Sequence, residues 1–317
     1  MDSLASANIS AWKELISTRE LVLDGGMATS LESDGYDLSG TLWSAQLLLD
    51  NPAAIEAVHL RHALAGADVL TTSAYQISRQ GFIAAGRTVD DSIEAIETST
   101  AIARSAAAQC LAISGRTVFV AASVGPYGAV LADGSEYRGD YNISRQELLD
   151  FHSERLHDIV ATEPDILAFE TIPSAMELSV INELLTTTFT SIPAWVSVSA
   201  QDQLRISDGT HISDAFELLD ASPIVAMGIN CTKPEYIADL LLHGSSVHPE
   251  RARIVYSNAG RTWDALNRIW LDEAGQTLPT ETIKDWRKNG ARLIGGCCGL
   301  GEPHITAVTQ IFSESSK

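Results

Sequence analysis

Short apolar runs rich in β-branched residues alternate with longer amphipathic stretches along the whole chain. Runs of this kind predict buried strands, and the stretches between them carry apolar residues at helical spacing. We count eight runs, at residues 21–24, 68–72, 117–124, 165–171, 194–199, 224–230, 253–258 and 292–297. Eight strands that each precede a helix predict an α/β protein with one (β/α)8 barrel, a TIM barrel, that forms a single domain over residues 1–317.

The stretches between the runs support this prediction. Clear helical patterns occupy residues 51–67, 91–113 and 144–161, and the last begins with Ser144 and Glu147 at the spacing of a capping box. Residues 1–18 precede the first strand and are expected to form an N-terminal helix or extension. Neither the dinucleotide fingerprint G-x-G-x-x-G nor a phosphate-binding G-x-x-x-x-G-K-[ST] loop is present, which argues against a doubly wound nucleotide-binding sheet.

Composition narrows the classes of partner. The 317 residues include 41 acidic and 21 basic side chains, which give a net charge of −20 without a basic patch. Such a balance argues against nucleic acids and anionic membranes as partners and favours small molecules. The sequence has no 18-residue apolar segment and no secretory signal pattern, and only four cysteines, so we expect a cytoplasmic protein with free thiols.

Three of those cysteines follow predicted strands. Cys231 comes after the sixth strand, and the pair Cys297 and Cys298 comes at the end of the eighth. In (β/α)8 barrels the catalytic residues lie at the carboxyl ends of the strands, so these thiols are expected on one rim. Cys110 falls inside the helix before the third strand and is predicted to be a buried structural thiol.

The three rim cysteines favour a metal site. Thiolates are soft ligands that suit zinc, and three protein ligands with one open position are typical of catalytic zinc. The glycines in "GGCCGLG" (295–301) keep bulk away from the sulfur atoms, which packing thiols would not require. Packing thiols, a catalytic nucleophile and a redox-active pair formed by Cys297 and Cys298 are the other interpretations of this pattern.

Three thiolates around zinc also predict a type of reaction. The net charge of such a centre is near −1, so it activates water poorly but still binds a fourth sulfur. Coordination deprotonates a thiol, whose ordinary pKa is about 8.5, and leaves it nucleophilic at neutral pH. The reaction that suits this centre is alkyl transfer to sulfur.

Seven stretches of the chain resemble homocysteine S-methyltransferases, particularly those that use S-methylmethionine. The stretches are "DGGMATSLE" (24–32), "LWSAQLL" (42–48), "DGSEYRGDY" (133–141), "FETIPS" (169–174), "GINC" (228–231), "VYSNAG" (255–260) and "IGGCCG" (294–299). The resemblance implies a zinc-dependent barrel that transfers a methyl group from a sulfonium donor to the zinc-bound thiolate of homocysteine. The product is methionine, which places the reaction in methionine biosynthesis.

The resemblance also implies a role for several residues. The thiolates that would hold Zn²⁺ are those of Cys231, Cys297 and Cys298. Asp24 and Glu170 would bind the ammonium group of homocysteine, because a cationic amine favours carboxylates. Backbone N–H groups near Gly25 and Gly26 would bind its carboxylate, because a glycine-rich turn supplies donors to an oxyanion.

Five further residues are candidates for the same pocket. Gln76 follows the second strand, where some family members have a residue that can approach the metal. Asn230 and Asn258 stand at the ends of strands and are expected to line the pocket. Trp43 and Tyr75 are expected to form walls around the sulfonium, since an aromatic face attracts a desolvated cation.

Other functions fit parts of the pattern. S-Adenosylmethionine is a second sulfonium donor, and betaine would make the chain a betaine-dependent homocysteine methyltransferase. A methylfolate or cobalamin route is disfavoured because one barrel fills the chain. A non-catalytic zinc-binding or thiol-sensing barrel is the alternative from another class. It would have no need of the rim carboxylates Asp24 and Glu170.

Overall fold

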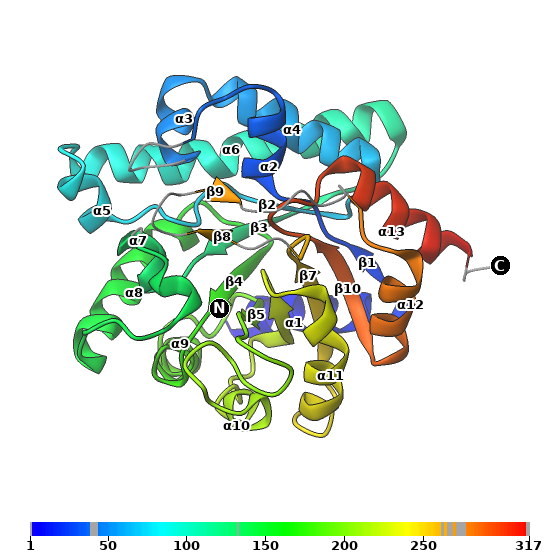
Figure 1. The fold of residues 1–317 in the computed structure, drawn as a ribbon. Coiled ribbons are helices and arrows are strands. Elements are labelled where there is room, and N and C mark those ends of the chain that lie inside the picture. Colours follow the sequence, from blue (N-terminus) through cyan, green and yellow to red (C-terminus); the bar gives the residue numbers. More distant parts are fainter. Residues whose placement is uncertain are drawn as a thin grey trace.

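Eight parallel strands form a ring at the centre of the computed structural model, as the apolar runs predicted (Figure 1). The structure describes residues 2–38, 44–131, 133–260, 263–264, 269–270 and 277–314. The strands of the ring are β1 (Leu21–Val22), β2 (Val69–Thr71), β3 (Phe119–Val124), β4 (Ile166–Ile172), β5 (Ala194–Val198), β6 (Ile224–Asn230), β7 (Ala252–Ser257) and β10 (Ala291–Gly296). The predicted (β/α)8 barrel is therefore confirmed.

The order of the strands around the ring is β1-β10-β7-β6-β5-β4-β3-β2. The ring closes between β1 and β2 through a single parallel bridge between Leu23 and Val69. Asp68 strengthens this closure, because its N–H donates to the carbonyl of Val22 (2.7 Å) and its Oδ2 accepts from the N–H of Val22 (2.9 Å). The carboxylate of Asp68 thus replaces a strand partner where β1 is short.

Helices connect successive strands and cover the outside of the ring (Figure 1). The longer ones begin at clear caps: Thr88 with Asp91, and Ser144 with Glu147, form capping boxes, the second as predicted. The helices are α1 (Asp2–Thr18), α2 (Met27–Ser33), α3 (Ser44–Asp50), α4 (Pro52–Ala65), α5 (Arg79–Ala84), α6 (Val89–Ser114), α7 (Tyr127–Leu131), the 3-10 turn η1 (Ser135–Tyr137), α8 (Arg145–Val160), α9 (Ala175–Thr187), α10 (Ile212–Glu217), α11 (Pro234–Gly244), α12 (Thr280–Lys288) and α13 (Glu302–Glu314).

The apolar residues form two separate cores. The larger lies between the strands and the surrounding helices, and includes Cys110 of α6, which is fully buried as predicted. The smaller fills the inside of the ring, and α1 contributes Trp12 to it. The Trp12 ring packs on Phe119 with centroids 5.0 Å apart, and its Nε1 donates to the carbonyl of Asp165 (3.1 Å). Helix α1 therefore packs against the amino-terminal ends of strands β3 and β4.

A buried arginine holds the loops at the opposite end. Arg155 of α8 donates to the carbonyl oxygens of Ala74 (2.7 Å), Tyr75 (2.6 Å) and Gly125 (2.8 Å). Because one rigid guanidinium satisfies three carbonyls, it fixes the loop after β2 against the loop after β3. Gly125 permits this approach, since a Cβ there would lie 2.7 Å from the ring of Tyr75.

Two short antiparallel strands, β8 (Trp263–Asp264) and β9 (Ile269–Trp270), lie between β7 and α12, where the apolar pattern predicted none. They pair with each other and stand apart from the eight-stranded ring. Across the described part of the chain, no helix combines the length and apolar character that a membrane crossing requires.

The closure of the ring through Asp68 can be tested by mutation. We expect Asp68→Ala to lower the free energy of unfolding by about 2 kcal/mol, because it leaves the buried N–H of Val22 without its charged acceptor. Asp68→Asn retains an acceptor oxygen and is expected to lose less. Urea denaturation followed by circular dichroism measures both effects, and an Asp68→Ala protein as stable as the parent would contradict this account.

Candidate active site

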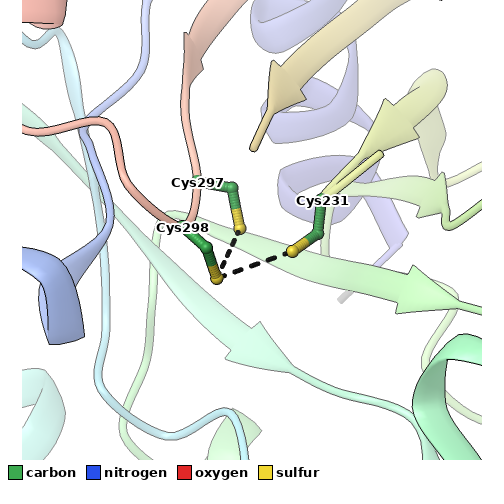
Figure 2. Close-up of side chains that lie close together, drawn as sticks. All are labelled: Cys231, Cys297 and Cys298. Carbon is green, nitrogen blue, oxygen red and sulfur yellow. Dashed lines mark hydrogen bonds between the residues drawn. The ribbon is translucent and has the colours of Figure 1, made fainter. Parts of the chain in front are cut away.

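The three rim cysteines meet at the carboxyl ends of β6 and β10. Cys231 directly follows β6, and Cys297 and Cys298 directly follow β10, with only β7 between the two strands. The three Sγ atoms lie within 4.8 Å of one another. The Cys231–Cys298 distance is 3.6 Å and the Cys297–Cys298 distance is 3.9 Å (Figure 2). The thiols therefore converge, as their strand positions predicted.

The spacing of the sulfur atoms fits a tetrahedral zinc ion. With Zn–S bonds of about 2.3 Å, two thiolates on such an ion stand about 3.8 Å apart. The observed distances of 3.6 and 3.9 Å are close to that value. Within the described ranges, no histidine, aspartate or glutamate joins the three cysteines. The donor set thus has the chemistry of a zinc site with a fourth position available to another ligand.

The three thiols also share a negative charge. Hydrogen bonds with Cys297 and Cys298 hold the pKa of the Cys231 thiol well below its ordinary value, although burial acts in the opposite direction. The same contacts raise the pKa values of the Cys297 and Cys298 thiols. One thiolate is therefore favoured within the cluster, and a bound cation would favour loss of the other two protons.

Hydrogen bonds with β7 and with the residue after it, Asn258, fix the backbone around the cluster. Cys231 has a φ of +44°, a left-handed conformation that non-glycine residues rarely adopt. Its N–H donates to the carbonyl of Tyr256 (3.0 Å), and its carbonyl accepts from Nδ2 of Asn258 (3.2 Å). The N–H of Cys297 donates to the carbonyl of Ser257 (2.8 Å). These bonds hold Cys231 in a strained conformation, which is common at functional sites.

The glycines after β1 bring a second loop against the cysteines. A Cβ on Gly26 would lie 2.6 Å from the carbonyl oxygen of Cys297, and one on Gly25 would lie 2.7 Å from that of Leu300. The two loops can therefore pack backbone to backbone only with glycine at these positions. The N–H of Gly26 donates to the carbonyl of Leu300 (2.8 Å). This N–H was predicted to bind the substrate, but it already has an acceptor within the protein.

A cavity of about 130 Å³ connects the cysteines with two carboxylates, Asp24 after β1 and Glu170 in β4. Asp24 accepts from the N–H (2.6 Å) and the hydroxyl (3.1 Å) of Thr71. Glu170 accepts from the hydroxyl of Ser123. No ion pair links either carboxylate to a basic side chain of the described residues, so both face the cavity without a neutralising partner.

Burial perturbs both carboxylates in the same direction. Loss of water raises the pKa of Asp24 to about 8 and that of Glu170 to about 7, and the hydrogen bonds that they accept oppose this only in part. A cation bound between them would lower both pKa values, because it stabilises the ionised forms. The pair therefore has the electrostatics of a site for a cationic group.

Comparison with known proteins identifies the family. A family model for homocysteine S-methyltransferase matches residues 21–312. The chain belongs to this family. Homocysteine S-methyltransferase YbgG from Bacillus subtilis is 41% identical over 294 residues, which cover 91% of this chain and 93% of the relative. Homocysteine S-methyltransferase from Escherichia coli is also 41% identical over 294 residues, covering 91% of this chain and 94% of the relative.

A solved structure supports the same assignment. The metallated form of the homocysteine methyltransferase MmuM from Escherichia coli superimposes with a TM-score of 0.84 at 38% identity, over 94% of this chain and 98% of that one. Both the family and the barrel inferred from the sequence are thus confirmed. The sequence also predicted a methyltransferase, which the family confirms.

The cavity of this family member includes residues that the sequence analysis missed. Tyr137 of η1 places its hydroxyl 3.4 Å from Sγ of Cys231. Thr71, Thr171 and Tyr256 line the cavity as well. Tyr137 lies in the stretch "DGSEYRGDY" (133–141), which carried the resemblance without any role for its members. The signal in the sequence that could have identified Tyr137 was its position in this stretch.

The remaining predicted residues differ in their placement. Tyr75 lines the cavity, as do Gly25 and Gly26. Gln76 does not line it, and its Nε2 donates to the carbonyl of Ala129 (3.1 Å). Trp43 lies outside the described residues.

The two candidate asparagines also do not line the cavity. Their side chains instead form hydrogen bonds with the backbone of residues that line it. Asn258 contacts Cys231, as described above. Asn230 accepts from the N–H of Thr171 (2.6 Å) and donates to its hydroxyl (2.8 Å). Thr171 has a φ of +61°, so each asparagine supports a left-handed residue of the cavity wall.

The support of Cys231 by Asn258 predicts an effect on metal binding. We expect Asn258→Ala to weaken zinc binding by about tenfold, because the Cys231 backbone loses the donor that fixes its conformation. Chelator competition measures the affinity. Asn289→Ala, at the end of α12, is the control and should bind zinc as the parent does. Equal zinc affinities in all three proteins would argue against this role of Asn258.

Proposed function

We propose that this chain is a zinc-dependent enzyme that transfers a methyl group from S-methylmethionine to the sulfur of homocysteine, which yields methionine. One observation carries the proposal: the cysteine cluster and the carboxylates of Asp24 and Glu170 line the same small cavity. A thiol amino acid has a sulfur for the former and an ammonium group for the latter. Family membership supports the same acceptor.

The side chains that would hold zinc are those of Cys231, Cys297 and Cys298. When bound there, the ion would supply the positive charge that deprotonates a thiol at neutral pH and keeps its sulfur in place. Asp24 and Glu170 then orient the acceptor through its ammonium group, as charge-assisted hydrogen bonds do. The sulfur and the ammonium group of the acceptor are thus held by different residues of the same cavity.

The acceptor carboxylate requires donors from the backbone. Because the N–H of Gly26 is bonded to Leu300, we assign this role to Gly25 and the first residues of α2, Met27 and Ala28, which line the cavity. The first N–H groups of a helix have no acceptor within the helix, so they are available to an anion.

Methyl transfer makes few further demands on the chain. The acceptor thiolate forms a bond to the methyl carbon while the donor S–C bond breaks, and the electron pair stays on the departing sulfur. No side chain has to transfer a proton, because the nucleophile is already deprotonated and the leaving thioether is neutral. The protein contributes alignment and a small cavity whose lining includes the aromatic side chains of Tyr75 and Tyr137.

The choice of donor is part of the proposal. S-Adenosylmethionine carries the same sulfonium and is proposed as a second donor, whereas betaine carries a quaternary ammonium. A purely thiol-sensing barrel is disfavoured because it would leave the buried charges of Asp24 and Glu170 without a function. We further propose that residues 1–317 act as one homocysteine-binding domain with residues 1–18 as its N-terminal extension. The cytoplasmic location stays a prediction.

Loss of one thiolate provides the first test. We expect Cys297→Ala to lose zinc and methyl transfer together, because two sulfur ligands hold the ion far less tightly than three. Zinc content is measured by metal analysis, and methionine formation is measured with S-methylmethionine, S-adenosylmethionine and betaine. Cys110→Ala, which alters a thiol of α6 that does not line the cavity, should keep both properties. A metal-free Cys297→Ala protein with full activity would overturn the zinc assignment, and parent enzyme inactive with both sulfonium donors would overturn the proposed donor.

The carboxylates provide the second test. We expect Asp24→Asn to raise the KM for homocysteine by about tenfold or more, because the ammonium group loses a charged acceptor. Zinc content should not change. Asp34→Asn removes an exposed charge at the end of α2 and is the control, with an unchanged KM. Steady-state kinetics with saturating donor gives the values, and equal KM values for Asp24→Asn and the parent would exclude this contact.

A further inference from the structure

One buried carboxylate oxygen near the cavity has no role in the acceptor site described so far. Glu136 lies in η1, and its Oε2 is buried without a hydrogen-bond partner among the described residues. Burial raises the pKa of Glu136 to about 7. An unsatisfied carboxylate inside a protein is unfavourable, so it is expected where a ligand supplies the missing charge.

Glu136 does not itself line the cavity, but it directly precedes Tyr137, which lines the sulfur end of the cavity. The charge of Glu136 acts on Cys231 and on the hydroxyl of Tyr75, both of which line the cavity. The next residue in the chain, Tyr137, contacts Sγ of Cys231 at 3.4 Å. An acceptor sulfur at the cysteine cluster must be approached by the donor methyl group. The donor sulfonium therefore has to lie near these same residues.

The η1 turn holds Glu136 in place. The hydroxyl of Ser199 donates to the Glu136 carbonyl (3.2 Å). Ser135 is fixed by Asp133, whose Oδ1 accepts from the Ser135 N–H (2.9 Å). A Cβ on Gly128 would lie 2.6 Å from the backbone nitrogen of Glu136, so α7 packs directly on the turn. The carboxylate is thus carried by a rigid element, as a recognition residue requires.

The basic side chain whose charge acts on Glu136, that of Arg138, is bonded to other residues. Arg138 donates from Nε to Asp140 (3.1 Å) and from Nη1 to the carbonyl of Asp133 (3.3 Å). No ion pair between Arg138 and Glu136 is formed in the described part of the chain. The carboxylate of Glu136 therefore remains available to an external cation.

We propose that Glu136 recognises the positively charged sulfonium of the methyl donor, with the rings of Tyr75 and Tyr137 beside it. This inference rests on the proposed methyl transfer and adds a donor-binding residue to it. In the reaction the sulfonium loses a methyl group, keeps the electron pair of the broken S–C bond and becomes a neutral thioether. The thiolate gains the methyl group and becomes neutral as well.

This change of charge predicts which kinetic constant depends on Glu136. The sulfonium carries its full charge in the bound donor and only part of it in the transition state. A nearby carboxylate therefore contributes more to donor binding than to the chemical step. Removing its charge should raise the KM for the donor without lowering kcat, a pattern that a general loss of structure would not produce.

The test compares Glu136→Gln, Glu136→Asp and the parent enzyme, all loaded with zinc. We expect Glu136→Gln to raise the KM for S-methylmethionine by about tenfold, with kcat equal to or above that of the parent and the KM for homocysteine within about a factor of two. Glu136→Asp restores the charge and should recover part of the affinity. Asp150→Asn, which removes a charge from an exposed side chain of α8, is the control and should behave as the parent.

A second ligand separates the sulfonium from the ammonium group of the donor. The compound 4-(dimethylsulfonio)butanoate is S-methylmethionine without its amino group, and it is measured as a competitive inhibitor of the donor. Glu136→Gln should weaken its binding by the same factor as that of S-methylmethionine. Weakened binding of S-methylmethionine alone would show that Glu136 reads the ammonium group and would overturn the inference.

Two further outcomes keep the inference separate from the proposed function. Active parent enzyme with an unchanged donor KM in Glu136→Gln would reject the role of Glu136 and leave the methyl transfer intact. Parent enzyme without activity on any sulfonium donor would reject the proposed function itself. Thermal unfolding and zinc content of Glu136→Gln are measured alongside, and both are expected to match the parent.

Discussion

The gathering of acidic groups in one small cavity is the constraint on which the rest of this site depends. Three sulfur atoms lie within 4.8 Å of one another, and two carboxylates line the same cavity. Desolvation raises the pKa values of Asp24 and Glu170, so the free protein bears these groups at a cost in stability. Bound cations would offset this cost. In the proposed reaction these cations are the ammonium group of the acceptor, the metal ion and the sulfonium of the donor.

The barrel can hold these groups together because its backbone is fixed independently of them. Cys231 and Thr171 keep left-handed conformations through bonds to Asn258 and Asn230, and Gly26 allows two loops to touch. These contacts all involve residues at the carboxyl ends of strands or just after them. The hydrogen-bonded parallel strands thus provide a rigid backbone, which keeps these acidic groups close together although their proximity is electrostatically unfavourable.

The sequence predicted the parts of the structure that depend on periodicity. Eight buried strands have a strong apolar signal, and their order in a barrel brings Cys231 to the pair at 297 and 298. The rest depends on side-chain direction and loop packing, which no pattern reports. Asn230 was expected in the pocket but bonds to the N–H and the hydroxyl of Thr171, and the position of Glu136 depends on the packing of the η1 turn on α7. The family resemblance marked this loop as part of the site but assigned no role to its residues.

The electrostatics of the cavity also bear on turnover. In the proposed reaction a thiolate and a sulfonium neutralise each other as the methyl group moves, and loss of charge is favoured in a medium of low dielectric constant relative to water. Once the transfer is complete, the donor sulfur is a neutral thioether and a carboxylate such as Glu136 no longer attracts it. The same buried charge that favours binding of the donor therefore does not hold the product, and exchange of methionine for a new sulfonium is favoured by the charge difference alone.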